Sequence, residues 1–168
     1  TGGVTQRARP TTSPGLPRGA VPGVEGLDIL RYRHVTNGWA WTDDDGRSDD
    51  SEEMFAYLHG YSPYHNTQAG TAYPPTLILT ADHDDRVVPA HSFKFAAALQ
   101  RDHQGDDPVL IRIETRAGHG AGMRTQQRIA EATDMWSFVA IQTGMEPTFA
   151  EDAEAGPTET TPAPEATP

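Results

Sequence analysis

The stretch "TLILTADHDDRVVP", Thr76 to Pro89, decides the fold. It begins with a nearly continuous apolar run and ends in a cluster of acids with one histidine. Such a run is typical of a strand that is buried on both faces of a parallel sheet. In parallel sheets the chemistry is carried by loops at the carboxyl ends of the strands. The stretch therefore predicts a buried strand over residues 76–82, followed by a loop that can hold a functional site.

The residues after Pro89 continue the pattern of strand and helix. A helix is predicted over 90–103, because its apolar residues recur at mostly helical spacing, and its packed face is expected to hold Phe93, Phe95, Ala96, Ala97 and Leu99. Residues 108–116 alternate with a period of two, which predicts a strand near a sheet edge. Val109, Ile111 and Ile113 would lie on one face of this strand.

A second helix is predicted over 124–143, with Gly144 as its C-cap and a packed face of Ile129, Ala132, Trp136, Val139 and Ala140. Upstream, residues 51–60 predict a shorter helix, capped by Ser51 or a neighbouring Asp and ended by Gly60. Two strand and helix units with short connections imply a parallel sheet with right-handed crossovers, which is an α/β fold.

Composition excludes several classes of function. The chain of 168 residues carries 24 acids, 13 bases and a net charge of -11, which argues against a nucleic-acid partner. It has no Cys, so disulfides and thiolate metal sites are excluded. No apolar run approaches the roughly 20 residues that span a bilayer. We expect no membrane contact and a cytoplasmic rather than a secreted location.

The two ends of the chain differ from its middle. Residues 1–22 hold four prolines and predict an irregular segment. Residues 147–168 consist mainly of Pro, Thr, Glu and Ala, which predicts a disordered acidic tail. Residues 23–146 are left for the folded domain.

The loop "RAGHGAGM", residues 116–123, follows the second strand. A histidine between glycines, with an acid on the neighbouring loop, fits the base and acid of a Ser-His-Asp triad. Two other interpretations stay open: a metal site made from His83, Asp84, Asp85 and His119, or a charged loop in which Asp85 and Arg86 merely pair. None of the chain's serines lies in a G-x-S-x-G elbow, so the triad interpretation lacks its nucleophile.

Four stretches resemble the C-terminal part of the catalytic domain of the prolyl oligopeptidase family: "GWAWTDDDGRSDD", "YSPYHN", "YPPTLILTADHDDRVVPAHSFKFAAALQ" and "AGHGAG". The resemblance runs from about Leu27 to about Ala140. It implies a partial α/β-hydrolase fold, and a serine endopeptidase that cleaves proline-containing oligopeptides after proline without a cofactor or metal.

The resemblance also implies residue roles. Asp84 would be the catalytic acid and His119 the general base. Arg86 would hydrogen-bond the substrate main chain, Val87 would form an apolar wall of the proline pocket, and the ring of Trp41 would stack on the substrate proline.

The chain departs from the family pattern in three ways. Asp45 stands where the family usually has an aromatic residue. The nucleophilic serine would fall immediately before Thr1, with Thr1 at an oxyanion-hole position. The N-terminal part of the catalytic domain and the β-propeller of the family would lie outside this chain. We therefore expect the isolated chain to be inactive, and a non-enzymatic hydrolase-fold remnant or interaction module remains the alternative.

Overall fold

The computed structural model describes residues 19–120, 123–146 and 148. The expectations for the irregular segment over 1–22 and the tail over 147–168 therefore lie almost wholly outside the described residues. The described elements are η1 (Tyr32–His34), η2 (Gly38–Trp41), α2 (Thr42–Asp45), α3 (Glu52–Tyr61), η3 (Pro63–Asn66), β1 (Thr76–Ala81), α4 (Ala90–Asp102), β2 (Val109–Glu114) and α5 (Thr125–Thr143).

Strand β1 is the centre of the fold. It pairs in parallel with β2, in a register that joins Thr76 to Val109 and Ala81 to Glu114. Its other edge bonds to the segment 20–24, where the Leu77 amide donates to the Ala20 carbonyl at 2.9 Å. All six residues of β1 are buried, which confirms the predicted strand and the parallel pairing.

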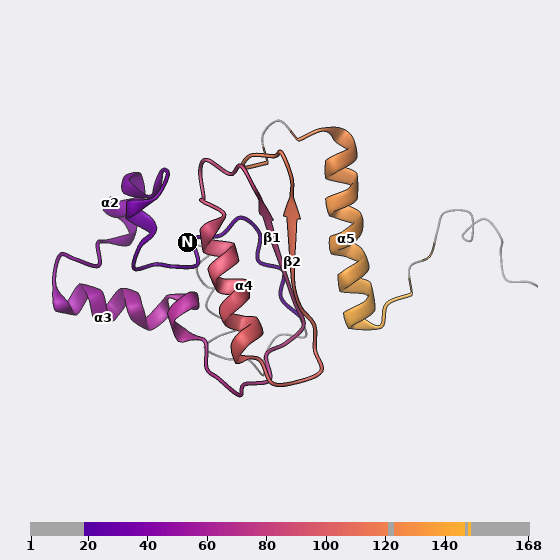
Figure 1. Ribbon diagram of the computed structural model, residues 1–168, viewed down its shortest axis with the longest axis horizontal. Coiled ribbons are helices and arrows are strands. Elements are labelled where there is room, and N and C mark those ends of the chain that lie inside the picture. The colour runs from indigo at the N-terminus through magenta and orange to yellow at the C-terminus, as the bar shows by residue number, and fades with distance from the viewer. Residues whose placement is uncertain (1–18, 121–122, 147, 149–168) are drawn as a thin grey trace, which may run out of the picture.

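Helices α4 and α5 lie on opposite sides of the sheet (Figure 1). Ile78 packs with Phe95 and Leu99 of α4, whereas Leu77 and Leu79 pack with Phe138 of α5. Successive side chains of a strand point to opposite faces, so each helix covers one set. This alternation is the reason that a continuous apolar run is needed in β1.

The packed face of α4 differs from the predicted one. Phe95, Ala96 and Leu99 are buried as expected, but Phe93 is 41% exposed and Ala97 is exposed as well. Ala98 takes the place of Ala97 in the buried face. The prediction was wrong for Phe93 and Ala97 because these residues, four apart, lie on one outward stripe of the helix.

The packed face of helix α5 differs more from the predicted one. Ile129 and Trp136 are each 59% exposed and Ala132 is exposed, so their predicted burial was wrong. The inward side instead meets Arg112 of β2, whose guanidinium pairs with Asp134 at 2.7 Å and with Glu131 at 3.6 Å. The buried residue of the helix is Phe138, which packs with Leu77 and Leu79 of β1. Gly144 does cap the helix, with φ of +67°.

Two smaller expectations also need comment. Ile113 of β2 is exposed, so the alternation holds for Val109 and Ile111, which pack toward α4, but not for the third residue. Ser51 caps α3 by accepting from the Met54 amide at 3.0 Å, as expected. Gly60, however, lies inside the helix, which ends one residue later at Tyr61.

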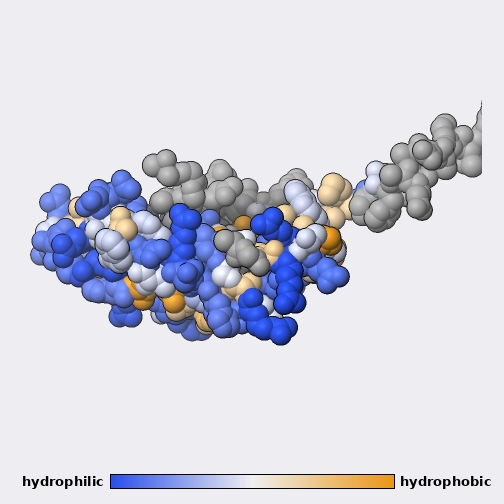
Figure 2. All heavy atoms as spheres, turned by 90° about the horizontal axis from the view of Figure 1, so that it is seen from above, coloured by the Kyte–Doolittle hydropathy of each residue, from blue (hydrophilic) through white to orange (hydrophobic). Residues whose placement is uncertain are grey.

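A second apolar cluster lies beside the sheet unit. Ile29, Tyr32 and Leu58 form its centre, and Trp41 and Tyr61 pack against it. Figure 2 looks down on the edge where β1 and β2 end, and the described surface there is mostly hydrophilic, with hydrophobic residues in separate patches. Within the described part of the chain, no helix is long and apolar enough to cross a membrane.

The corrected face of α4 can be tested with two phenylalanines of one helix. Phe95→Ala removes a side chain that is 1% exposed, and we expect a loss of about 3 to 5 kcal/mol in the free energy of unfolding. Phe93→Ala is the matched control and should cost about 0.5 kcal/mol or less. Urea unfolding followed by circular dichroism measures both, and equal losses would contradict the observed face.

Candidate active site

The loops after β1 and β2 meet at the carboxyl edge of the sheet. The His83 amide donates to the Ala117 carbonyl at 3.1 Å. Asp82 joins the loops from the other side, because its Oδ1 accepts from the Arg116 amide at 2.7 Å. A hydrogen bond from the His83 side chain, together with those from the amides of Ala117 and Arg116, lowers the pKa of the Asp82 carboxyl. Asp82 is therefore one of the residues that hold the two loops together.

Asp84 and His119 face each other across this junction. Asp84 is 4% exposed, and its Oδ1 accepts from the amides of Arg86 at 2.9 Å and Val87 at 2.8 Å. Its Oδ2 lies 2.8 Å from Nδ1 of His119. The carboxylate is thus fixed by its own loop before it meets the imidazole.

This contact determines what the imidazole can do. A carboxylate accepts hydrogen bonds only, so Nδ1 of His119 carries the proton and Nε2 is left with the lone pair in the neutral ring. The side chain of His119 is 24% exposed. The arrangement can therefore accept a proton at Nε2 from a neighbouring group and hold the resulting charge beside Asp84.

A hollow of about 120 Å³ lies beside His119. The end of β1, from Leu79 to Ala81, forms one wall, and Val24 and Met123 form another. Gly118 and Gly120 also line it, and Gly120 has φ of +79°, a conformation that favours glycine. The two glycines of "GHG" thus leave the imidazole next to an open space, as the sequence suggested.

No serine is in hydrogen-bond contact with His119 in the part of the chain that the structure describes. Ser48 donates to the Leu30 carbonyl, Ser51 caps α3, and Ser62 accepts from the Ile29 amide. Thr1, the expected oxyanion-hole position, lies outside the described residues.

The two other interpretations of the first loop find no contact to support them. Among residues 19–120, 123–146 and 148, no group of three or more His, Asp or Glu side chains could hold a metal ion. His83 turns toward Asp82 and has an exposed side chain. Over the same residues, Asp85 and Arg86 form no ion pair. The geometry therefore favours the pairing of Asp84 with His119.

The three expected substrate-binding residues are not gathered in one contact. Arg86 is exposed, and its carbonyl accepts from the Thr36 hydroxyl at 2.9 Å. Val87 is buried beside Asp84. Trp41 lies in the second apolar cluster, where its ring stacks on Tyr32 with centroids 6.3 Å apart. No hydrogen bond or ring contact among the described residues joins Trp41 to Arg86 or Val87.

Two features of this region were not predicted from the sequence. Thr36 anchors the Arg86 backbone and has φ of +43°, which no sequence signal announces for a β-branched residue. Burial, with a further contribution from the charge of Asp45, raises the pKa values of Tyr32 and Tyr61 to about 12. The carboxylate that replaces the family's aromatic residue therefore acts on the cluster that holds Trp41.

Comparison with known proteins places these features in a family. The sequence model of the prolyl oligopeptidase family matches residues 1–146. The prolyl endopeptidase of Elizabethkingia meningoseptica is 53% identical over 144 residues, which are 86% of this chain and 20% of that protein. Prolyl oligopeptidase A of Galerina marginata is 49% identical over 127 residues, 75% of this chain and 17% of that protein. The chain thus spans about a fifth of the length of the curated relatives it matches.

Solved structures agree with the sequence comparison. A structure from a study of two prolyl endopeptidases superposes with a TM-score of 0.77 at 40% identity, covering 92% of this chain and 22% of that one. Prolyl oligopeptidase B of Galerina marginata, in complex with a 35-residue peptide, gives 0.80 at 37% identity over 88% of this chain and 21% of that one. The partial α/β-hydrolase fold expected from the sequence is confirmed, and the chain belongs to the prolyl oligopeptidase family.

Proposed function

We propose that this chain supplies the acid and the base of a serine-type peptidase that cleaves short peptides after proline. The observation that carries the proposal is the contact of 2.8 Å between Oδ2 of Asp84 and Nδ1 of His119. The relatives named prolyl endopeptidase support the reaction and its specificity. A cytoplasmic location is part of the same proposal.

The chemistry would follow from the orientation of the imidazole. With Nδ1 held by Asp84, Nε2 of His119 removes the proton of a serine hydroxyl. The serine oxygen at the same time attacks the carbonyl carbon of the substrate proline. The imidazolium then gives this proton to the leaving amine, and water repeats the cycle on the acyl group. Asp84 stabilises the imidazolium and keeps the ring in the required tautomer throughout.

Substrate recognition would rest on Arg86, Val87 and Trp41. The exposed guanidinium of Arg86 offers donors to a peptide carbonyl, and its backbone is fixed from both sides, by Asp84 and by Thr36. Val87 contributes an apolar wall. Trp41 offers a flat aromatic face that suits the rigid ring of proline.

The pairing of Asp84 with His119 can be tested by nuclear magnetic resonance. A hydrogen bond from Nδ1–H to a buried carboxylate protects this proton from exchange and moves its resonance strongly downfield. We expect such a resonance in the chain, and we expect Asp84→Asn to abolish it. Asp85→Asn is the matched control and should leave it in place. A resonance that survives Asp84→Asn would contradict the assigned pair.

The proline pocket can be tested with a neutral ligand, N-acetyl-Gly-Pro-amide, titrated into the chain and followed by tryptophan fluorescence. Trp41→Ala should weaken its binding by roughly 3- to 10-fold, because a stacked ring contributes about 0.5 to 1.5 kcal/mol. Trp39→Ala is the control, since Trp39 lies in the same turn and is 68% exposed. Equal loss of affinity in the two variants would remove Trp41 from the pocket.

Hydrolysis of an N-acyl-Gly-Pro chromogenic substrate tests whether the chain needs a further group. No described serine contacts His119, so we expect the purified chain to release chromophore at the background rate. His119→Ala should then be indistinguishable from the unaltered chain. Turnover that depends on His119 would show that a nucleophile is present after all, and would end the alternative of a non-enzymatic module.

A further inference from the structure

A second hollow lies away from His119, between the turn that follows Asp28 and the first turn of α4. Its volume is about 310 Å³, at the lower end of the range for small-molecule sites. It is lined by Arg31, His34, Val35, Val88, Ala90, His91 and Lys94. Nothing in the acid–base chemistry at Asp84 and His119 uses this hollow.

The titratable residues that line this hollow are basic, whereas the chain as a whole is acidic. Four of the seven residues are Arg, Lys or His and none is acidic, although acids outnumber bases 24 to 13 in the whole sequence. Ala90 and His91 belong to the first turn of α4, which has no acidic residue and no side-chain cap. The backbone amides there add a partial positive charge to that of the side chains.

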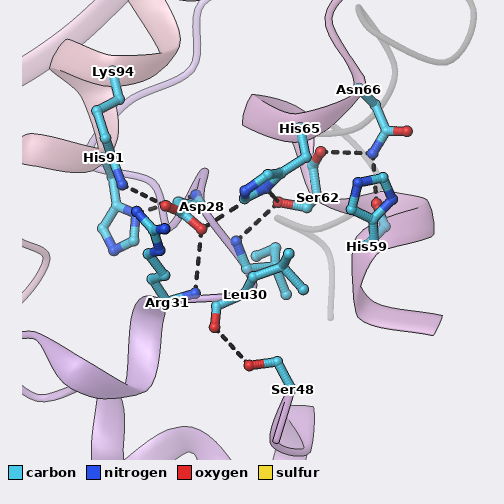
Figure 3. Close-up of polar contacts among 11 residues, drawn as sticks. Asp28, Leu30, Arg31, Ser48, His59, Ser62, His65, Asn66, His91 and Lys94 are labelled. Carbon is cyan, nitrogen blue, oxygen red and sulfur yellow. Dashed lines mark hydrogen bonds and ion pairs between the residues drawn. The ribbon is translucent and has the colours of Figure 1, made fainter. Parts of the chain in front are cut away.

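A buried acid fixes the pocket from behind. Asp28 is fully buried, and its Oδ2 pairs with the Lys94 ammonium while its Oδ1 accepts from the Arg31 amide at 3.2 Å. Its own amide donates to Nδ1 of His91 at 3.1 Å. Figure 3 shows Arg31, His91 and Lys94 arranged around this one carboxylate. Asp28 thus contacts the backbone or side chain of three of the four basic residues, Arg31, His91 and Lys94.

Asp28 neutralises Lys94 but leaves the charge of Arg31 unmatched. The guanidinium of Arg31 takes part in no ion pair within the described residues, whereas Arg33 pairs with Asp49 and Arg47 pairs with Asp49 and Asp50. Arg31 is exposed, so its planar donors are available to solvent. A guanidinium of this kind matches the two oxygens of a carboxylate or phosphate.

We propose that this hollow is a binding site for a small anion that carries a carboxylate or phosphate group. Arg31 binds the oxyanion with two donors, and His34 and the first turn of α4 complete the polar side. Val35 and Val88 form the apolar side, against which a short organic body packs. The lining of the hollow does not include Arg86, Val87 or Trp41, although Val88 directly follows Val87 and the Thr36 hydroxyl donates to the Arg86 carbonyl.

The test is a titration of the whole chain with two probes, succinate and inorganic phosphate, at constant ionic strength. Amide resonances of Val35 and Ala90 and the Nε–H resonance of Arg31 report on the hollow. We expect saturable shifts at these three groups. Shifts with both probes support an oxyanion site that tolerates either source, and shifts with one probe alone support the proposal and name the source. Absence of saturable shifts with either probe overturns it.

Two variants make the test specific. Arg31→Gln should weaken binding about ten-fold or more, because a charge-assisted pair is lost, while the control Arg47→Gln should change it less than about two-fold. Ala90→Glu places a carboxylate at an exposed first-turn position that favours acids. It should raise the melting temperature and block both probes. Equal titration of the two arginine variants, or an unchanged titration of Ala90→Glu, overturns the proposal.

Discussion

The structure depends on the burial of β1 on both faces and both edges. Its side chains meet α4 on one face and α5 on the other, and its backbone bonds to β2 and to the segment 20–24. A strand enclosed in this way has no freedom to slip, because a shift of one residue would turn Leu77 and Ile78 to the wrong helices. The position of Asp84, three residues beyond its end, is therefore set by the core.

How far the sequence predicts this fold differs between its elements. The run that forms β1 is apolar for burial on both faces, so its pattern and its environment agree, and its bounds were predicted within one residue. The phase of α5 was predicted wrongly, because Ile129 and Trp136 stay exposed while Glu131 and Asp134 pair with Arg112, a residue of another element. Periodicity reports the apolar residues of one segment and carries no information about a charged partner elsewhere.

The same distinction applies to the sites. The pairing of Asp84 and His119 was within reach, because both follow predicted parallel strands whose carboxyl ends share an edge, and the family resemblance named the same two residues. The anion pocket could not be predicted, since its four basic residues come from two segments about 60 residues apart, and three of them meet at Asp28. Contacts through a single buried carboxylate leave no local pattern to recognise.

The spacing of Asp84 and His119 has a consequence for the biosynthesis of the protein. They lie 35 positions apart, with the helix α4 and the strand β2 between them. The partner segment of β1 at residues 20–24 precedes both in the chain. A domain that is made from its N-terminus can therefore bring acid and base together once the second loop has left the ribosome, while α5 is still inside it. On this order α5 packs after the two loops have met, and it then closes the second face of β1.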